Sequence, residues 1–158
     1  MVSAGVCYNG KGRLHFVPEK AKIKADYYVS NLLPELLEGC FEQVGNVFIF
    51  HQDGAPAHTA KHTQDFPLIN CPDFIDKDEW PPNSPDLSPL NYHVWGEMMT
   101  RYSSLSPKLT DVNQLKDALQ IIWNELPQAS INKAISTFRQ TLQSCNRVEG
   151  RHFEQLLR

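Results

Sequence analysis

The chain has 158 residues and a formal net charge of −3, from 15 Lys and Arg against 18 Asp and Glu. This length suits one domain with one hydrophobic core, and 41% hydrophobic with 21% charged residues argues against wholesale disorder. The acidic balance excludes a generic basic nucleic-acid coat protein. No apolar run approaches the roughly 18 residues that span a bilayer, and no signal peptide begins the chain, so we expect an intracellular protein that is not secreted.

The four cysteines lie far apart and form no C-x-x-C pair. A disulfide framework or a zinc site would cluster them or space them as ligand pairs. The spacing therefore predicts small buried thiols in a reducing compartment at Cys7, Cys40, Cys71 and Cys145.

The first half of the chain alternates strand and helix signals. Residues 2–7 and 13–17 flank Asn9-Gly10, which predicts an antiparallel hairpin. Asp26 is placed to N-cap a helix that continues through Glu38, kinks or splits at Pro34, and ends at Gly39.

An uninterrupted apolar run at Val47–Phe50 predicts a strand that is buried on both faces, as in the centre of an α/β sheet. A short helix over 59–66 and a short strand over 73–76 follow. Residues 80–89 contain four prolines and predict a stiff loop.

The second half reads as helical. Ser88 as N-cap and Pro89 as the first helical residue predict a helix that runs to about Arg101. Apolar residues three and four apart predict another over 110–126, which Pro127 ends, and a last one from Ile131 to Cys145. The fold class is therefore α/β, followed by C-terminal helices.

Two residues are the strongest candidates for a chemical site. Asp53 follows the buried strand, at the edge where open α/β sheets place their chemistry; the alternative is a carboxylate that only caps the turn at Gly54. Asn91 lies in the first turn of the helix after the proline loop. Its neutral amide is a poor ligand for a hard divalent cation, and the alternative is a tolerated polar residue on an exposed turn.

Two segments carry a family resemblance. The sequence His51-Gln52-Asp53-Gly54-Ala55-Pro56-Ala57-His58-Thr59-Ala60 resembles the second-aspartate motif of mariner-type transposases, and residues 80–91 resemble their third-carboxylate motif. The opening residues 3–6 and the segment 123–127 are also similar to that family. Two long motifs in the right order make the resemblance specific, and it covers nearly the whole chain.

The resemblance implies an RNase H-like mixed sheet with flanking helices, in which three carboxylates hold two divalent metal ions, Mg²⁺ or Mn²⁺. It assigns the second carboxylate to Asp53 and the third to Asn91, with 37 residues between them. The family's first aspartate belongs to a central strand before the hairpin, and this sequence starts at the hairpin. We therefore expect a catalytic-domain fragment, truncated at its N-terminus, that has lost DNA cleavage and strand transfer.

The same resemblance sets the remaining expectations. Residues 1–158 would form one partial catalytic domain, with strands and helices in 1–101 and a helical part in 102–158. DNA is the implied partner, with a second copy or an intact transposase as others, and the nucleus is the implied location. The alternative is a domesticated, non-catalytic module that binds nucleic acid or a transposase.

Several side chains are candidates for DNA contact. His58 would either touch phosphate or cap the following helix. Lys20, Lys22 and Lys24 alternate and would either follow a phosphate backbone or form a solvated edge. Trp80 and Trp95 are expected to pack in the interior instead of stacking on bases.

Overall fold

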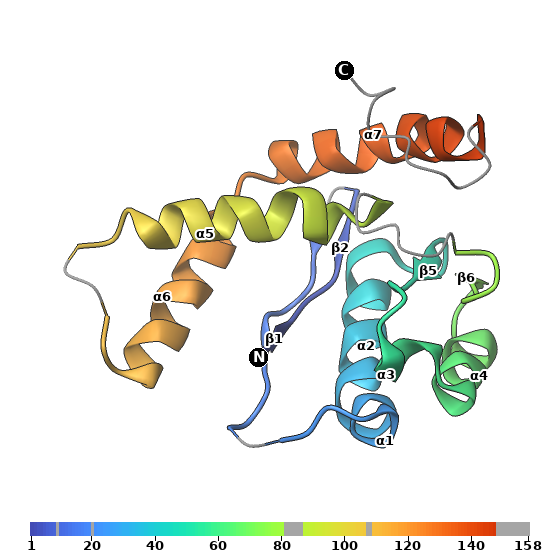
Figure 1. The fold of residues 1–158 in the computed structure, drawn as a ribbon, viewed down its shortest axis with the longest axis horizontal. Helices are drawn as coiled ribbons and strands as arrows, with labels where there is room; N and C mark the ends of the chain where they lie inside the picture. The colour runs from blue at the N-terminus through green and yellow to red at the C-terminus, as the bar shows by residue number, and fades with distance from the viewer. Residues whose placement is uncertain (9, 20, 81–86, 107–108, 148–158) are drawn as a thin grey trace.

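The computed structural model describes residues 1–8, 10–19, 21–80, 87–106 and 109–147, with 139–147 described by their backbone alone. The described elements form two groups around an N-terminal hairpin (Figure 1). Helices α5, α6 and α7 lie on one side of the hairpin, and helices α1 to α4 with strands β5 and β6 lie on the other.

The hairpin consists of two short antiparallel pairs. β1 (Val2–Ser3) pairs with β4 (His15–Phe16), and β2 (Val6–Cys7) pairs with β3 (Gly10–Lys11). Gly10 packs closely against the neighbouring helix: a Cβ there would lie 2.7 Å from the side-chain oxygen of Gln43. The predicted hairpin is confirmed.

The first helical segment keeps a helical backbone through α1 (Ala25–Tyr27), a π-helical turn η1 (Tyr28–Leu32) and α2 (Leu33–Val44). Pro34 lies in the first turn of α2, and the chain does not split at that proline. The π-helical turn places Tyr28 in the interior, where its side chain is buried.

Both predicted ends of this helical segment were wrong. It begins after Lys24, and Asp26 lies inside its first turn and caps nothing by its side chain. Gly39 is buried within α2, and the helix ends instead at Gly45, whose φ of +66° is the left-handed backbone that glycine adopts at low cost.

Two parallel strands form the second sheet. β5 (Ile49–His51) pairs with β6 (Asp73–Ile75), with Phe50 opposite Phe74. The connection holds α3 (Pro56–Thr59) and α4 (Lys61–Asn70), which replace the single helix predicted over 59–66. The break falls at Ala60, whose backbone is extended. Antiparallel and parallel pairs therefore occur together, as three two-stranded sheets within the described residues.

The prediction that residues 47–50 are buried on both faces was wrong. Phe50 packs against the core below the sheet, but Ile49 is 58% exposed and Val47 is 87% exposed. Within the described residues β5 pairs with β6 alone, and no described element covers the face that carries Ile49 and Val47.

The remaining elements are helical: a second π-helical turn η3 (Leu90–Val94), α5 (Trp95–Ser103), α6 (Val112–Glu125) and α7 (Gln128–Arg147). The predicted start at Ser88 is supported by its carbonyl oxygen, which accepts the backbone N–H of Asn91 at 2.9 Å. Pro127 separates α6 from α7, as predicted. Most of the predicted proline loop, residues 81–86, lies outside the described residues.

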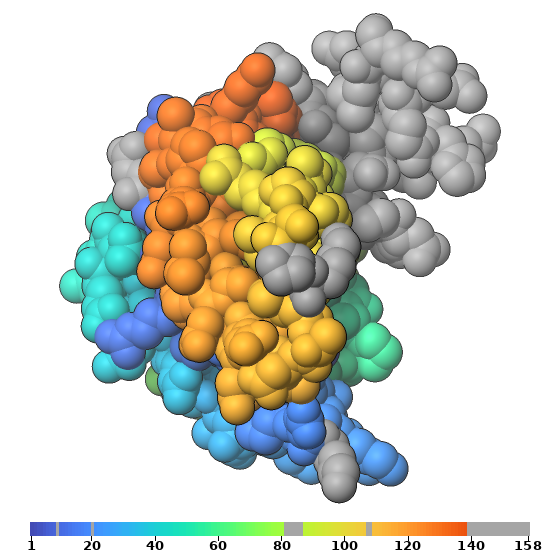
Figure 2. All heavy atoms as spheres, turned by 90° about the vertical axis from the view of Figure 1, so that its left-hand side faces the viewer, coloured from blue at the N-terminus to red at the C-terminus, as the bar shows by residue number. Residues whose placement is uncertain are grey.

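The buried side chains form two clusters. The first joins the hairpin to α5, α6 and α7 through Ala4, Leu14, Val94, Met98, Ile122, Trp123, Leu126 and Ile131. The second joins α1, η1 and α2 to β5 through Val17, Tyr28, Leu32, Leu33 and Leu37, with Phe50 against them. Figure 2 shows α5, α6 and the described part of α7 covering the face on the side of the first cluster.

The described cysteines are less buried than predicted. Cys7, Cys40 and Cys71 are free thiols, but each is half-buried where full burial was predicted, and the side chain of Cys145 lies outside the described residues. Among the described helices, none combines the length and the apolar character that a bilayer crossing requires.

Candidate functional site

Asp53 lies two residues beyond β5, in the turn that leads to α3. Its Oδ1 accepts the backbone N–H of Ala55 at 3.1 Å, so the carboxylate does cap the turn at Gly54. Its side chain is nevertheless 39% exposed and in contact with other polar groups. The turn-capping role and a place in a polar site are therefore both present.

His58 is a hydrogen-bond partner of the Asp53 carboxylate. The short helix α3 folds back so that Nδ1 of His58 lies 2.7 Å from Oδ1 of Asp53. The predicted alternatives for His58 were a phosphate contact or a helix cap. Its imidazole caps no helix; the side chain of Gln64 instead donates to the His58 carbonyl oxygen at 2.8 Å.

Asn91 acts on the same carboxylate. The π-helical turn η3 carries Asn91, which is exposed and whose side chain is near enough to Asp53 to affect its pKa. The structure thus places near each other the two positions that the family resemblance singles out. The donors hold the pKa of Asp53 below its ordinary value: His58 has the largest effect, burial opposes it, and Ala55 and Asn91 add to the lowering.

Tyr28 and Gln52 form a buried layer under this carboxylate. Nε2 of Gln52 donates to the Tyr28 hydroxyl at 2.5 Å, and the Tyr28 ring lies 4.5 Å from the His58 ring. Burial raises the pKa of Tyr28. Sequence reasoning missed Tyr28 because a π-helical turn has no signal in the sequence pattern. Oε1 of Gln52 is buried and has no hydrogen-bond partner among the described residues.

Three nearly parallel rings lie beside the site. His51 stacks on Trp80 at 4.8 Å between centroids and on Phe138 of α7 at 5.8 Å. Burial lowers the pKa of His51, and Asp53 opposes that shift. Trp80 is buried and Trp95 stacks on Trp123 at 6.3 Å, so both tryptophans pack in the interior as predicted.

The predicted lysine contacts lie on the surface near α3 and α4. Lys22 and Lys24 are exposed just before α1, which packs against both of those helices, and Lys20 lies outside the described residues. Nε2 of His62 on α4 lies 3.1 Å from Oδ1 of Asp26 on α1, at the surface of this contact. Lys61, at the start of α4, is also exposed.

The side chains at this site are poor ligands for a divalent metal ion. Asp53 supplies its one carboxylate, which accepts hydrogen bonds from Ala55 and His58, and Asn91 supplies a neutral amide. Across the part of the chain that the structure describes, no three His, Cys, Asp or Glu side chains are grouped so that they could hold a metal ion. Because Mg²⁺ and Mn²⁺ prefer several hard oxygen ligands, the residues present do not fit such an ion.

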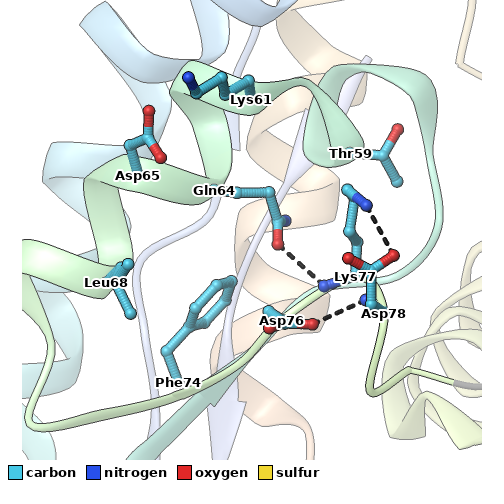
Figure 3. Close-up of a pocket in the computed structure, with 9 residues that line it drawn as sticks. All are labelled: Thr59, Lys61, Gln64, Asp65, Leu68, Phe74, Asp76, Lys77 and Asp78. Carbon is cyan, nitrogen blue, oxygen red and sulfur yellow. Dashed lines mark hydrogen bonds and ion pairs between the residues drawn. The ribbon is translucent and has the colours of Figure 1, made fainter.

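A separate cavity of about 410 Å³ lies between α4 and the end of β6 (Figure 3). Leu68 and Phe74 form its apolar wall, and Lys77 donates its backbone N–H to Gln64 at 2.8 Å across it. Its charged groups largely satisfy one another: Lys77 pairs with Asp78 at 2.6 Å, and Asp76 accepts the backbone N–H of Asp78 at 2.7 Å. The cavity does not include Asp53 or Asn91.

Curated relatives match about two thirds of the chain. The Tc1 transposase of Caenorhabditis elegans is 31% identical over 111 residues, which cover 69% of this chain and 38% of that protein. The Tcb2 transposase of Caenorhabditis briggsae is 30% identical over 107 residues, covering 68% of this chain and 37% of that protein. The matched part of the chain thus spans less than two fifths of the length of these relatives. No family model matches the chain.

Solved structures share the fold. The Mos1 transposase catalytic domain, in a structure with raltegravir and Mn, superposes with a TM-score of 0.79 at 18% identity, over 96% of this chain and 76% of that one. The Mos1 transposase in a paired-end complex with the left transposon end superposes with a TM-score of 0.75 at 20% identity, over 92% of this chain and 42% of that one. The predicted mixed α/β fold of a transposase catalytic domain is confirmed.

Proposed function

Because the chain is a homologue of the Tc1/mariner transposases and folds like a mariner catalytic domain, we propose that it is a transposase catalytic region that has kept the fold and lost metal-dependent cleavage. The observation that supports this proposal is the asparagine at position 91. Where the family resemblance implies two carboxylates, this chain has one carboxylate and one amide.

Loss of cleavage follows from what phosphoryl chemistry requires. Metal ions in a two-metal site activate the attacking oxygen and stabilise the leaving oxygen, and carboxylates hold those ions in place. Replacing the third carboxylate by Asn91 removes one charge, and the remaining carboxylate already accepts hydrogen bonds from His58 and Ala55. The side chains at this position therefore orient one another and do not gather cations.

The activity that this protein keeps is binding of DNA without cleavage, and its place is the nucleus. Lys22 and Lys24 are exposed beside α3 and α4, and Lys61 adds a third cation at the start of α4. A row of lysines beside a transposase fold suits the phosphate backbone of DNA, to which the Mos1 neighbour is bound in its paired-end complex. His58 is 23% exposed at the same side of the fold.

A binding titration tests this surface. Fluorescence anisotropy with a labelled duplex, at several salt concentrations and in EDTA, should show affinity that falls as salt rises. The double variant Lys22→Gln/Lys24→Gln should bind more weakly and reduce the salt slope by about 2. Lys133→Gln, an exposed lysine on α7, is the matched control. If Lys133→Gln weakens DNA binding as much as the double variant does, or if the affinity does not change with salt, Lys22 and Lys24 are not part of the DNA-binding surface.

A nicking assay tests the loss of cleavage separately. Supercoiled plasmid incubated with the chain and Mn²⁺ should stay supercoiled, at the same level as with Asp53→Ala. Nicking by the wild-type chain that disappears in Asp53→Ala would show that this site still cleaves DNA. Because Asp53→Ala should not weaken binding to DNA in EDTA, the two assays separate binding from catalysis.

A further inference from the structure

The hairpin and strand β5 pack against opposite flanks of α2. A Cβ at Gly10 of the hairpin would lie 2.7 Å from Oε1 of Gln43, whereas the ring of Phe41 lies 5.1 Å from that of Phe48, next to β5. Because a helix has 3.6 residues per turn, Phe41 and Gln43 point to nearly opposite sides of α2. Between these two flanks α2 carries Cys40, which is only half-buried.

Helix α7 also contacts both segments. Nε2 of Gln128 donates to the Cys7 carbonyl oxygen at 3.1 Å, and the ring of Phe138 stacks on His51 of β5 at 5.8 Å. Gln128 and Phe138 are ten positions apart on α7, which is about 15 Å along a helix. Neighbouring strands of a sheet lie only about 4.8 Å apart. The hairpin and β5 are therefore too far apart to pair, and the spacing leaves room for a further strand between them.

The edge of β5 that faces the hairpin is open, because β6 pairs along its other edge (Figure 1). Among the described residues, no other group forms a hydrogen bond with the backbone of 47–51. Val47 and Ile49 remain exposed on this strand, although parallel strands are ordinarily buried on both faces. Residues 45–52 contain no Lys, Arg, Asp, Glu or Pro, the residues that keep open edges from pairing. These are the features of an edge that accepts an added strand.

We propose that the hairpin and β5 flank an open strand position, which takes one extended apolar segment of another transposase polypeptide. A strand in this position would join sheets that are separate among the described residues. Its side chains would alternate between two faces. Phe50 and the cluster around Leu33 line the face toward α2, and Ile49 and Phe138 line the face toward α7. The partner segment is therefore apolar on both faces.

The superposition on Mos1 supports a transposase as the source of this segment. It covers 96% of this chain but 76% of the Mos1 catalytic domain, so about a quarter of that domain has no counterpart in residues 1–158. The fold thus accommodates more chain than these residues supply. The proposal rests on the shared fold and not on DNA binding, so it stands or fails separately from the proposed function.

Binding of a synthetic strand tests the proposal. The probe is a fluorescent peptide of six alternating Val and Ile residues with two lysines at each end, titrated with the full chain and followed by anisotropy. Half-saturation should come at or below about 1 mM, and hydrogen exchange of the backbone amides of 47–51 should slow in the complex. Ile49→Lys should weaken binding about tenfold. Ile69→Lys, the same change at an exposed position of α4, should not weaken it.

Backbone methylation of the peptide distinguishes a strand that inserts from one that adds to an outer edge. Successive N–H groups of a strand point to opposite edges, so N-methyl groups on the odd or on the even residues block one edge each. An inserted strand pairs along both edges, so both methylated peptides should bind at least about tenfold more weakly than the unmethylated one.

Three results of these titrations would overturn the proposal. They are no binding of the unmethylated peptide at about 1 mM, undiminished binding of either methylated peptide, and equal binding by Ile49→Lys and Ile69→Lys. A chain that sediments as a dimer without peptide, and that Ile49→Lys makes monomeric, would also overturn it, because a second copy would then occupy the position. If Ile49→Lys does not fold, the two methylated peptides decide the outcome.

Discussion

Lys11 and Trp123 are joined twice, although 112 positions separate them in sequence. The Lys11 ammonium donates to the Trp123 carbonyl oxygen at 2.5 Å and lies 5.9 Å from the centre of the indole ring. In return, Nε1 of Trp123 donates to the Gly12 carbonyl oxygen at 2.9 Å. Lys11 also donates to the carbonyl oxygens of Asn124 and Leu126, so the cation caps the C-terminal end of α6.

Replacing Lys11 should therefore weaken the attachment of the hairpin to α6. Lys11→Met keeps much of the aliphatic stem and removes three charge-assisted hydrogen bonds, so we expect a loss of about 1–3 kcal/mol in the free energy of unfolding. Unfolding in urea measures this loss. Lys133→Met, at an exposed position on α7, is the control and should change stability by less than about 0.5 kcal/mol. Equal stability of the two variants would contradict the capping role.

Asp111 is the N-cap of α6. Its side chain accepts the backbone N–H groups of Asn113 at 3.0 Å and Gln114 at 3.1 Å. Asp111→Ala should cost about 1 kcal/mol of stability. Asp117→Ala, which removes the same charge from an exposed position later in the helix, should cost less. The prediction fails if chemical denaturation finds the two losses alike.

Gly45 ends α2 with a backbone that side chains disfavour. Its φ of +66° and ψ of −142° lie where L-residues are strained, although a Cβ would meet no atom within 4 Å. Gly45→Ala should therefore destabilise the chain by about 1–3 kcal/mol. Gly96→Ala, in the exposed face of α5, should stabilise it slightly. Differential scanning calorimetry of both variants checks the opposite signs.

Local signals predicted much of this fold. The Asn-Gly turn predicted the hairpin, and apolar spacing predicted α6 and α7. Gly39 and Gly45 show the limit: Gly39 lies inside α2 and Gly45 ends it, and of the two only Gly45 has a positive φ. Burial of Val47 and Ile49 was wrongly predicted because an apolar run shows only that the residues are hydrophobic. Whether they are buried depends on which element covers the strand.

The candidate site was predicted in part. Motif resemblance selected Asp53 and Asn91, and in the structure Asn91 is near enough to Asp53 to affect its pKa; their role as a site stays a prediction. It could not select Tyr28 or Phe138, because each reaches the site through tertiary packing from a distant helix. The role of His58 as the partner of Asp53 likewise depends on how sharply α3 folds back after the turn.

Alkaline pH should destabilise the fold through its thiols. Burial raises the pKa of Cys40 and that of Cys71 from 9.0 to about 11 each. Below pH 9 these thiols are neutral in both the folded and the unfolded chain, so they do not change the free energy of unfolding. Above pH 9 the thiols of the unfolded chain ionise first, so the free energy of unfolding falls as pH rises toward 11. Tyr28, whose pKa burial also raises, adds to the loss above pH 10.

Urea midpoints under reducing conditions, measured from pH 8 upward, check this dependence. The variant Cys40→Ala/Cys71→Ala should lose stability less steeply with pH than wild type, whatever its stability at pH 8. Identical slopes for the two proteins would assign the alkaline loss to other groups.

Binding of Mn²⁺ by the full chain, followed by the electron paramagnetic resonance signal of the free ion, tests most directly the claim that Asp53 and Asn91 do not form a metal centre. The wild-type chain should leave the free-ion signal as high as Asp53→Ala does. A stoichiometric loss of signal with wild type that Asp53→Ala abolishes would show a metal site at Asp53 and contradict the account.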